Sequence, residues 1–337
     1  MLKRFTLGDA LRGIAAIGVV ALHTRLPLPF AEFNALWPDF FFVLSGLVLA
    51  KYYRAETSEI SFAKFAAKRA VRFYPLVLVA LLSYLIIVVV TSHIGTTDAW
   101  PAALTPLNFV AALALLQVFY PASTPVLYPL WSLSAELVVN LGAFALFRKY
   151  GTRALIAAAV LGTAATTWQV SLNPTDISPP FLGLAAVSRA LTGFALGLLI
   201  QRFPLSKARG LGLAATIAAL FALVWFANVS PYATVAAPLI FAAALRYAYL
   251  AEDRFATTRF TRVAEFLGTS SFGIYVWHEA LLPVALKVAD KLFGFNSTPM
   301  RIALFVILLG LTLAVTRLTY RWVEKPTMNW INARTRR

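Results

Sequence analysis

The sequence predicts an all-α polytopic membrane protein, a bundle of about ten transmembrane helices with one further segment that enters the membrane or lies on it. Hydrophobic residues make up 60% of the 337 residues and charged residues 13%, and the mean hydropathy is +0.75. Water-soluble domains do not have this balance. Apolar stretches of spanning or near-spanning length recur along the whole chain, and Lys and Arg gather between alternate stretches.

The expected spans are 8–24, 37–53, 75–94, 129–147, 154–170, 186–201, 211–228, 232–250, 264–288 and 300–320. A shorter stretch at 104–120 follows Trp100 and Pro101 and contains Pro106, so we expect it to be re-entrant or interfacial. With ten spans both termini are cytoplasmic, and 25 of the 30 Lys and Arg residues lie on the inner side. If 104–120 also crossed, the split would be 13 inward and 17 outward. The positive-inside rule therefore favours ten spans.

The connections are too short for a separate soluble domain, so we expect one transmembrane domain over residues 1–337 with its core at 8–326. The absence of cysteine excludes disulfides, thiolate catalysis and iron–sulfur clusters. His23, His93 and His278 are too few and too scattered to predict a metal site, and none is expected. The net charge of +16 is explained by topology and not by nucleic-acid binding.

The first span carries Arg12 and His23, which bracket ten uncharged residues. In a helix this spacing places a cation near one membrane surface and an imidazole roughly 16 Å deeper. Ionisable groups in a bilayer are costly and usually functional. A signal anchor is the alternative, but it does not account for the many later apolar segments.

The second span begins with Asp39 and contains Ser45 and Gly46 at mid-depth. Asp39 starts a span just after the one that ends in His23, so it could orient that imidazole; it could also be a solvated loop acid. Small residues such as Ser45 and Gly46 commonly mark close helix packing. Gly193 and Gly197 in a later span have the same usual meaning.

Residues 58–75 are expected to form a helix with Ser61 as its N-cap and Pro75 near its end. Arg69 and Arg72 share one face of this helix at the cytoplasmic surface. They could contact anionic lipid, or, together with Arg12, they could grip a diphosphate with their planar donor groups.

The fourth span contains Trp131, Ser132 and Glu136, with Glu136 about two turns inside the membrane. A buried Glu needs a partner, which could be a substrate hydroxyl or a cation such as Arg189.

In the ninth span, Ser271, Tyr275 and His278 lie on one helical stripe, with Glu279 as a further polar neighbour. Such a stripe is not expected to face lipid. Near the end of the last span, a local ion pair with a neighbouring basic residue is sufficient to explain Glu324.

Together these segments resemble the acyltransferase-3 family of integral-membrane acyltransferases, many of which O-acetylate bacterial surface or secreted sugars. The resemblance rests on the segments GDALRGIAAIGVVALH, FFFVLSG, KRAVRFYP, LWSLSAE, SSFGIYVWH and the terminal Glu324-x-Pro326. It implies that His23 is catalytic and that Arg12, Arg69 and Arg72 bind acyl-CoA on the cytoplasmic side. Some relatives continue into an esterase-like periplasmic domain, whereas we expect a stand-alone membrane unit here.

The residues and the resemblance lead to one hypothesis: an enzyme of the bacterial inner membrane that moves an acyl group, acetyl in the simplest case, from cytoplasmic acetyl-CoA to a hydroxyl of a glycan or lipid-linked saccharide. His23 would act as the general base, oriented by Asp39 or Glu136, or would carry the acyl group covalently. The expected cavity residues are Ser45, Trp131, Ser132, Ser271, Tyr275 and His278.

Membrane lipids, another copy of the chain and polysaccharide-assembly proteins are the other expected partners. The main rival is a transporter or flippase that uses the same buried groups as a substrate or proton pathway. The second rival is a non-catalytic subunit of an envelope polysaccharide complex.

Overall fold

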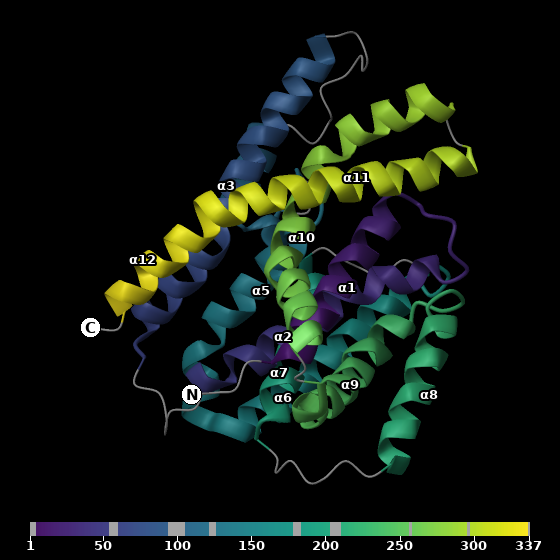
Figure 1. Cartoon of the computed structure of the whole chain (residues 1–337). Coiled ribbons are helices and arrows are strands. Elements are labelled where there is room, and N and C mark those ends of the chain that lie inside the picture. Colours follow the sequence, from purple (N-terminus) through teal and green to yellow (C-terminus); the bar gives the residue numbers. More distant parts are fainter. Residues whose placement is uncertain are drawn as a thin grey trace.

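The computed structural model describes residues 5–53, 60–93, 105–120, 126–177, 183–202, 210–255, 258–294 and 297–335. Within these ranges every regular element is helical (Figure 1), which confirms the all-α class there. In chain order the elements are α1 (Thr6–His23), η1 (Ala31–Leu36), α2 (Trp37–Leu49), η2 (Ala50–Tyr52), α3 (Phe62–His93), α4 (Pro106–Leu113), η3 (Gln117–Phe119), α5 (Leu130–Gly142), α6 (Phe144–Leu172), α7 (Gly183–Ile200), α8 (Gly210–Phe226), α9 (Ala233–Phe255), α10 (Thr258–Phe293), α11 (Thr298–Thr319), η4 (Tyr320–Glu324) and α12 (Lys325–Thr335).

Eight segments of the described chain are long and apolar enough to cross a membrane. They are Thr6–His23, Ala31–Tyr52, Phe62–Val90, Phe144–Leu172, Gly183–Ile200, Ala233–Glu252, Arg259–Phe293 and Thr298–Arg334. Two expected spans, 129–147 and 211–228, correspond instead to shorter helices: α5 has 13 residues, and the apolar part of α8 is Gly212–Phe226. At 1.5 Å per residue α5 is about 20 Å long, shorter than a hydrocarbon layer of about 30 Å. Eight candidate spans and two short helices thus stand where ten spans were expected.

The segment at 104–120, of which 105–120 is described, contains α4 and η3. The side chain of Thr105 caps α4, whose eight residues extend about 12 Å. This length is far below a bilayer crossing. The expectation that the segment does not span agrees with this short helix.

The helix expected at 58–75 does not end near Pro75. Its start agrees with the expectation, since the Ser61 hydroxyl accepts a hydrogen bond from the Lys64 backbone N–H at 3.3 Å. Pro75, however, lies inside α3, which continues to His93. A membrane helix tolerates proline because neighbouring helices can satisfy the freed backbone group. The helix that carries Arg69 and Arg72 is therefore continuous with the third span.

Close helix packing through glycine joins α2 to α7, as the sequence predicts. A Cβ on Gly193 would approach the side chain of Phe42, and one on Gly197 would collide with the backbone of Val43. Gly46 of α2 in turn faces the backbone of Phe194. These glycines let the two helices approach closely, which fixes the position of Ser45 beside Gly46.

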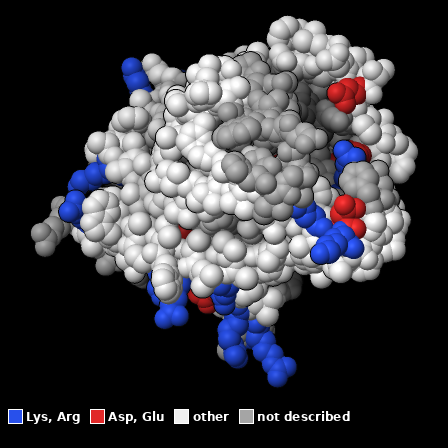
Figure 2. Space-filling view, turned by 90° about the horizontal axis from the view of Figure 1, so that it is seen from above, with Lys and Arg blue, Asp and Glu red and all other residues white. Residues whose placement is uncertain are grey.

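The outside of the bundle is apolar. Many large hydrophobic side chains are exposed, among them Ile86, Leu161, Phe221, Val306 and Leu318. In one face of the molecule, the described Lys, Arg, Asp and Glu side chains lie mostly toward the margin, and uncharged side chains cover most of the other described surface (Figure 2). Such a surface suits contact with lipid. Helices α11 and α12 run as one long rod across the bundle and end near the start of α3 (Figure 1).

Candidate functional site

One cavity contains the three arginines expected to bind a donor. Arg12 comes from α1, and Arg69 and Arg72 from α3. Five further expected site residues line the same cavity: Ser45, Ser132, Glu136, Ser271 and Tyr275. We call it the arginine cavity. Five helices, the consecutive α1, α2 and α3 together with α5 and the distant α10, thus place polar side chains around one space.

Each arginine of this cavity has an acidic neighbour. Arg69 pairs with Glu136, which also accepts a hydrogen bond from Ser45. The partner of Glu136 is therefore Arg69 and not Arg189, the cation considered from the sequence. Arg12 pairs with Asp9 at 3.1 Å. These carboxylates reduce the cost of burying the guanidinium groups and hold them in place.

Glu324 pairs with Arg72 at 3.2 Å, although the two residues are far apart in the chain. The expectation of a local ion pair at Glu324 is therefore wrong. The cause is the rod of α11 and α12, which packs against α3 and carries Glu324 to Arg72. Pro326 is the second residue of α12 and directly follows the π-helical turn η4 within this rod. Glu324 of the Glu324-x-Pro326 motif thus holds Arg72 in place, although it does not line the arginine cavity itself.

A second cavity contains His23. Besides His23 at the end of α1 it is lined by Trp131, Tyr128, Tyr275 and Glu32, among others. We call it the histidine cavity. The irregular turn before α5 forms one wall through Tyr128 and Pro129, which is the setting in which irregular backbone is tolerated at membrane depth. The Tyr128 ring packs edge-on against the His23 ring, with the two ring centroids 5.8 Å apart.

Tyr275 separates the two cavities, because it lines both of them. Its hydroxyl lies 2.7 Å from the hydroxyl of Ser132, and it donates a hydrogen bond of 3.1 Å to the backbone oxygen of Pro129. Both side chains are buried. The pair forms a polar partition between Arg12, Arg69 and Arg72 on one side and His23 on the other.

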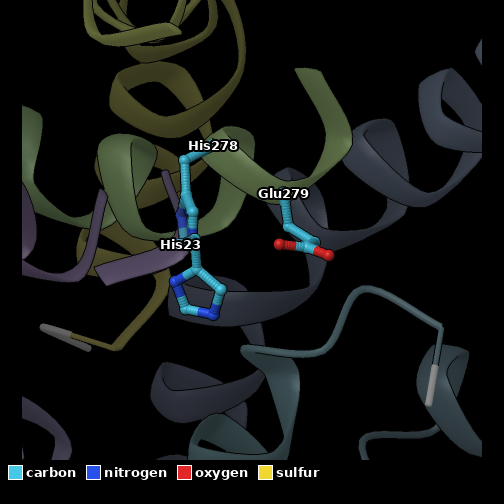
Figure 3. Close-up of side chains that lie close together, drawn as sticks. All are labelled: His23, His278 and Glu279. Carbon is cyan, nitrogen blue, oxygen red and sulfur yellow. The ribbon is translucent and has the colours of Figure 1, made fainter. Parts of the chain in front are cut away.

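His23 lies beside His278 and Glu279 (Figure 3). The two imidazole rings have centroids 4.9 Å apart, and the potential ligand atoms of all three residues lie within 4.8 Å of one another. Two of the three histidines are therefore not scattered, contrary to the expectation from the sequence, because α1 and α10 pack together and bring His23 and His278 into contact. Two imidazoles and a carboxylate are a donor set that could hold a divalent metal ion.

Asp39 does not orient His23. Both of its carboxylate oxygens accept hydrogen bonds from Arg189, at 3.0 and 2.7 Å. The pair is almost completely buried, with 1% of the Arg189 side chain and none of Asp39 exposed. The Arg189 guanidinium also lies 5.2 Å from the centre of the Trp131 ring. Asp39 thus holds a cation of α7 next to the histidine cavity.

Two residues of this region were missing from the expected site. Glu279 was noted only as a neighbour of the His278 stripe, and Arg189 only as a possible partner of Glu136. A signal was present in both cases, since each is an ionisable residue within an apolar span. Their partners depend on which helices pack together. The side chain of His93 lies outside the described residues.

Comparison with known proteins gives one positive result. A family model described as an acyltransferase domain, Acyl_transf_3, matches residues 9–321. The match contains every expected catalytic, donor-binding and cavity residue, whereas Glu324 and Pro326 follow it. No curated protein and no solved structure shows significant similarity to the chain.

Proposed function

Since the chain belongs to the acyltransferase-3 family over nearly its whole length, we propose that it is a membrane O-acyltransferase that takes an acyl group, acetyl in the simplest case, from cytoplasmic acyl-CoA. The acceptor is a hydroxyl of a glycan or lipid-linked saccharide at the opposite membrane face. In this proposal the protein resides in the bacterial inner membrane with both termini in the cytoplasm, as the distribution of Lys and Arg favours.

The observation that carries the proposal is the pair of cavities on either side of Tyr275 and Ser132. A donor with phosphate groups suits the arginine cavity, because guanidinium groups bind phosphate oxygens in pairs. An uncharged sugar hydroxyl suits the histidine cavity, where an imidazole and aromatic rings are available. Two substrates from opposite faces could thus meet at the partition.

In the donor complex, phosphates bind between Arg12, Arg69 and Arg72 and share these cations with Asp9, Glu136 and Glu324. The acidic partners keep the guanidinium groups oriented before the donor arrives, which lowers the cost of binding. The thin pantetheine arm then extends toward Tyr275. Separation of the Tyr275 and Ser132 hydroxyls opens the path to His23.

The transfer step uses His23 as a general base. Its Nε2 removes the proton of the acceptor hydroxyl while the oxygen attacks the thioester carbon. The C–O bond forms, the C–S bond breaks, and the thiolate takes the proton from the imidazolium to give the free thiol of CoA. In the covalent alternative, His23 itself attacks the thioester and passes the acyl group to the hydroxyl in a second step.

The test of the donor is ligand stabilisation of the purified protein, measured by thermal unfolding with acetyl-CoA, CoA and desulfo-CoA. A ligand that binds only the folded state adds about 2.7 kcal/mol at a hundredfold excess over Kd. Arg72→Lys keeps a charge beside Glu324 but lacks the planar fork, so we expect it to weaken this stabilisation. Lys64→Ala, an exposed change on the same helix, is the matched control and should leave it unchanged.

The test of the reaction is thiol release from acetyl-CoA in the presence of candidate glycans. We expect release by the wild type and not by His23→Ala, while both still bind CoA. Protein that is folded yet neither binds CoA nor releases thiol would overturn the proposal. Movement of a labelled solute across proteoliposomes without loss of thioester would favour the transporter instead.

A further inference from the structure

The acidic residues near the cavities differ in whether their carboxylate oxygens already have hydrogen-bond partners. Asp39 has both oxygens bonded to Arg189, and Glu136 is bonded to Arg69 and Ser45. Glu279 differs, because its buried Oε2 has no hydrogen-bond partner among the described residues. Of these three carboxylates, Glu279 is the one whose potential ligand atom lies within 4.8 Å of those of His23 and His278.

Backbone contacts fix the tautomers of the two histidines. Nδ1 of His23 lies 2.9 Å from the Val19 carbonyl oxygen, and Nδ1 of His278 lies 3.1 Å from that of Ile274. A carbonyl oxygen can only accept, so each Nδ1 must carry a proton. In the neutral rings each Nε2 is therefore an acceptor. Nε2 of His278 is buried and has no hydrogen-bond partner in the described part of the chain.

One ring nitrogen of each histidine and a Glu279 carboxylate oxygen lie within 4.8 Å of one another (Figure 3). Since each Nδ1 is bonded to a backbone carbonyl, the groups left to accept in this cluster are the two Nε2 atoms and the Glu279 carboxylate. Acceptors that face one another in a low-dielectric interior repel, and they are stabilised when a positive charge enters. The proposed reaction creates such a charge, because His23 becomes an imidazolium when it takes the proton of the acceptor. The charge then appears on a histidine that already has a carboxylate and an acceptor imidazole beside it.

We propose that Glu279 and His278 are positioning residues for His23, which stabilise its imidazolium while the acyl group is transferred. This inference rests on the proposed acyltransferase function. The proton leaves the acceptor hydroxyl, is held on Nε2 of His23 facing Nε2 of His278 and the Glu279 carboxylate, and passes to the departing thiolate. Glu279 and His278 end the cycle in the protonation states in which they began. Glu279 takes the role that the sequence suggested for Asp39 or Glu136.

The kinetic test compares the wild type with Glu279→Gln and Glu279→Asp, by thiol release from acetyl-CoA with water or monosaccharides as acceptors. We expect Glu279→Gln to lower kcat by tenfold or more and to leave KM for acetyl-CoA within twofold, because the donor binds in the other cavity. Glu279→Asp should recover part of the rate, since it restores the carboxylate. Asp290→Asn removes an exposed charge from the same helix and should have no effect.

A second measurement does not depend on turnover. Diethyl pyrocarbonate modifies neutral imidazole, so the modification rate of His23 at pH 6, followed by mass spectrometry, reports how well its protonated form is stabilised. We expect His23 of Glu279→Gln to react at least threefold faster than that of the wild type. If the wild type releases no thiol but this difference appears, the proposed function fails and the coupling of the two residues stands.

Two results would overturn the inference. One is an unchanged kcat and an unchanged modification rate in folded Glu279→Gln. The other is a stoichiometric metal ion in the purified protein that is lost in His278→Asn, which would assign His23, His278 and Glu279 to a metal site.

Discussion

Asp39 and Arg189 form the most deeply buried ion pair among those described, and their role is best understood from the cost of separating them. With 1% of one side chain and none of the other exposed, neither charge can be solvated by water if its partner is removed. Breaking a buried pair typically costs about 3–5 kcal/mol, because an uncompensated charge remains. The pair lies against Trp131, at the wall of the histidine cavity.

We therefore expect Asp39→Asn to reduce the free energy of unfolding by about 3–5 kcal/mol, measured by thermal unfolding of the purified protein. The double change of Asp39→Leu with Arg189→Met should recover much of this loss, because no unpaired charge remains. A single variant as stable as the wild type would contradict the assignment of Asp39 as a structural partner of Arg189.

At the partition, the hydroxyl of Tyr275 can be removed with little change of shape. Tyr275→Phe loses the contact with Ser132 and the hydrogen bond to Pro129, but Arg12, Arg69 and Arg72 remain. We expect the apparent Kd for CoA to stay within twofold, while kcat of thiol release rises, because the contact with Ser132 that must break before the thioester reaches His23 is already lost. Equal changes in the apparent Kd for CoA and in kcat would show that Tyr275 acts in donor binding alone.

At the scale of the helix, α2 and α7 depend on the absence of side chains at their contact. A Cβ on Gly197 would collide with the Val43 carbonyl oxygen, whereas one on Gly310 of α11 would meet nothing within 4 Å. We expect Gly197→Ala to lower the free energy of unfolding by about 1–3 kcal/mol, the usual cost of overpacking. Gly310→Ala, the matched control, should be neutral or stabilising by up to about 1 kcal/mol.

The same unfolding assay with both variants checks this prediction. A Gly197→Ala protein that unfolds like Gly310→Ala would mean that α2 and α7 have room to separate. Ser45 would then be less firmly placed beside Glu136 than its hydrogen bond indicates.

Helices were predictable where a local pattern determines them. The apolar runs gave the main spans, Ser61 gave the start of α3, and Gly193 and Gly197 gave a close helix contact. Prediction was wrong at Pro75, because a proline rule from water-soluble helices does not account for neighbours that satisfy the backbone inside a bundle. It was also wrong for 129–147, where α5 ends at Gly142 and α6 starts at Phe144, since hydropathy alone does not reveal a break between two apolar helices.

At the scale of the whole molecule, the sequence predicts which residues belong to the site, but not which acidic residue pairs with which arginine. Arg12 and His23 lie on one helix, so their separation follows from helical geometry. The partners of the acids follow from packing: Arg72 and Glu324 are 252 positions apart, and Asp39 and Arg189 are 150 apart. No local pattern relates such residues. The intramembrane ionisable residues therefore indicated where function lies, and only the fold indicated which charge meets which.

The topology of the whole molecule can be tested directly because the chain has no cysteine, so each single-cysteine variant carries one thiol. Lys149 and Thr175 are exposed and flank the long part of α6 that runs from Gly151 to Leu172, one on each side. Arg334 is exposed in α12. With cytoplasmic termini, a maleimide that cannot cross membranes should label Thr175→Cys in intact cells. Lys149→Cys and Arg334→Cys should react only after lysis.

The inverted pattern would place the arginine cavity on the outer side, where acyl-CoA is not available, and would contradict the proposed donor. Labelling of Lys149→Cys and Thr175→Cys from the same side would show that α6 does not cross the bilayer. The expected pattern, in contrast, would place Arg12 toward the cytoplasm and His23 toward the opposite face, since α1 carries the two residues at different depths. A donor and an acceptor from opposite sides would then meet at Tyr275 and Ser132, which lie between the two cavities. In the proposed mechanism, separation of these two hydroxyls is therefore a step of each turnover.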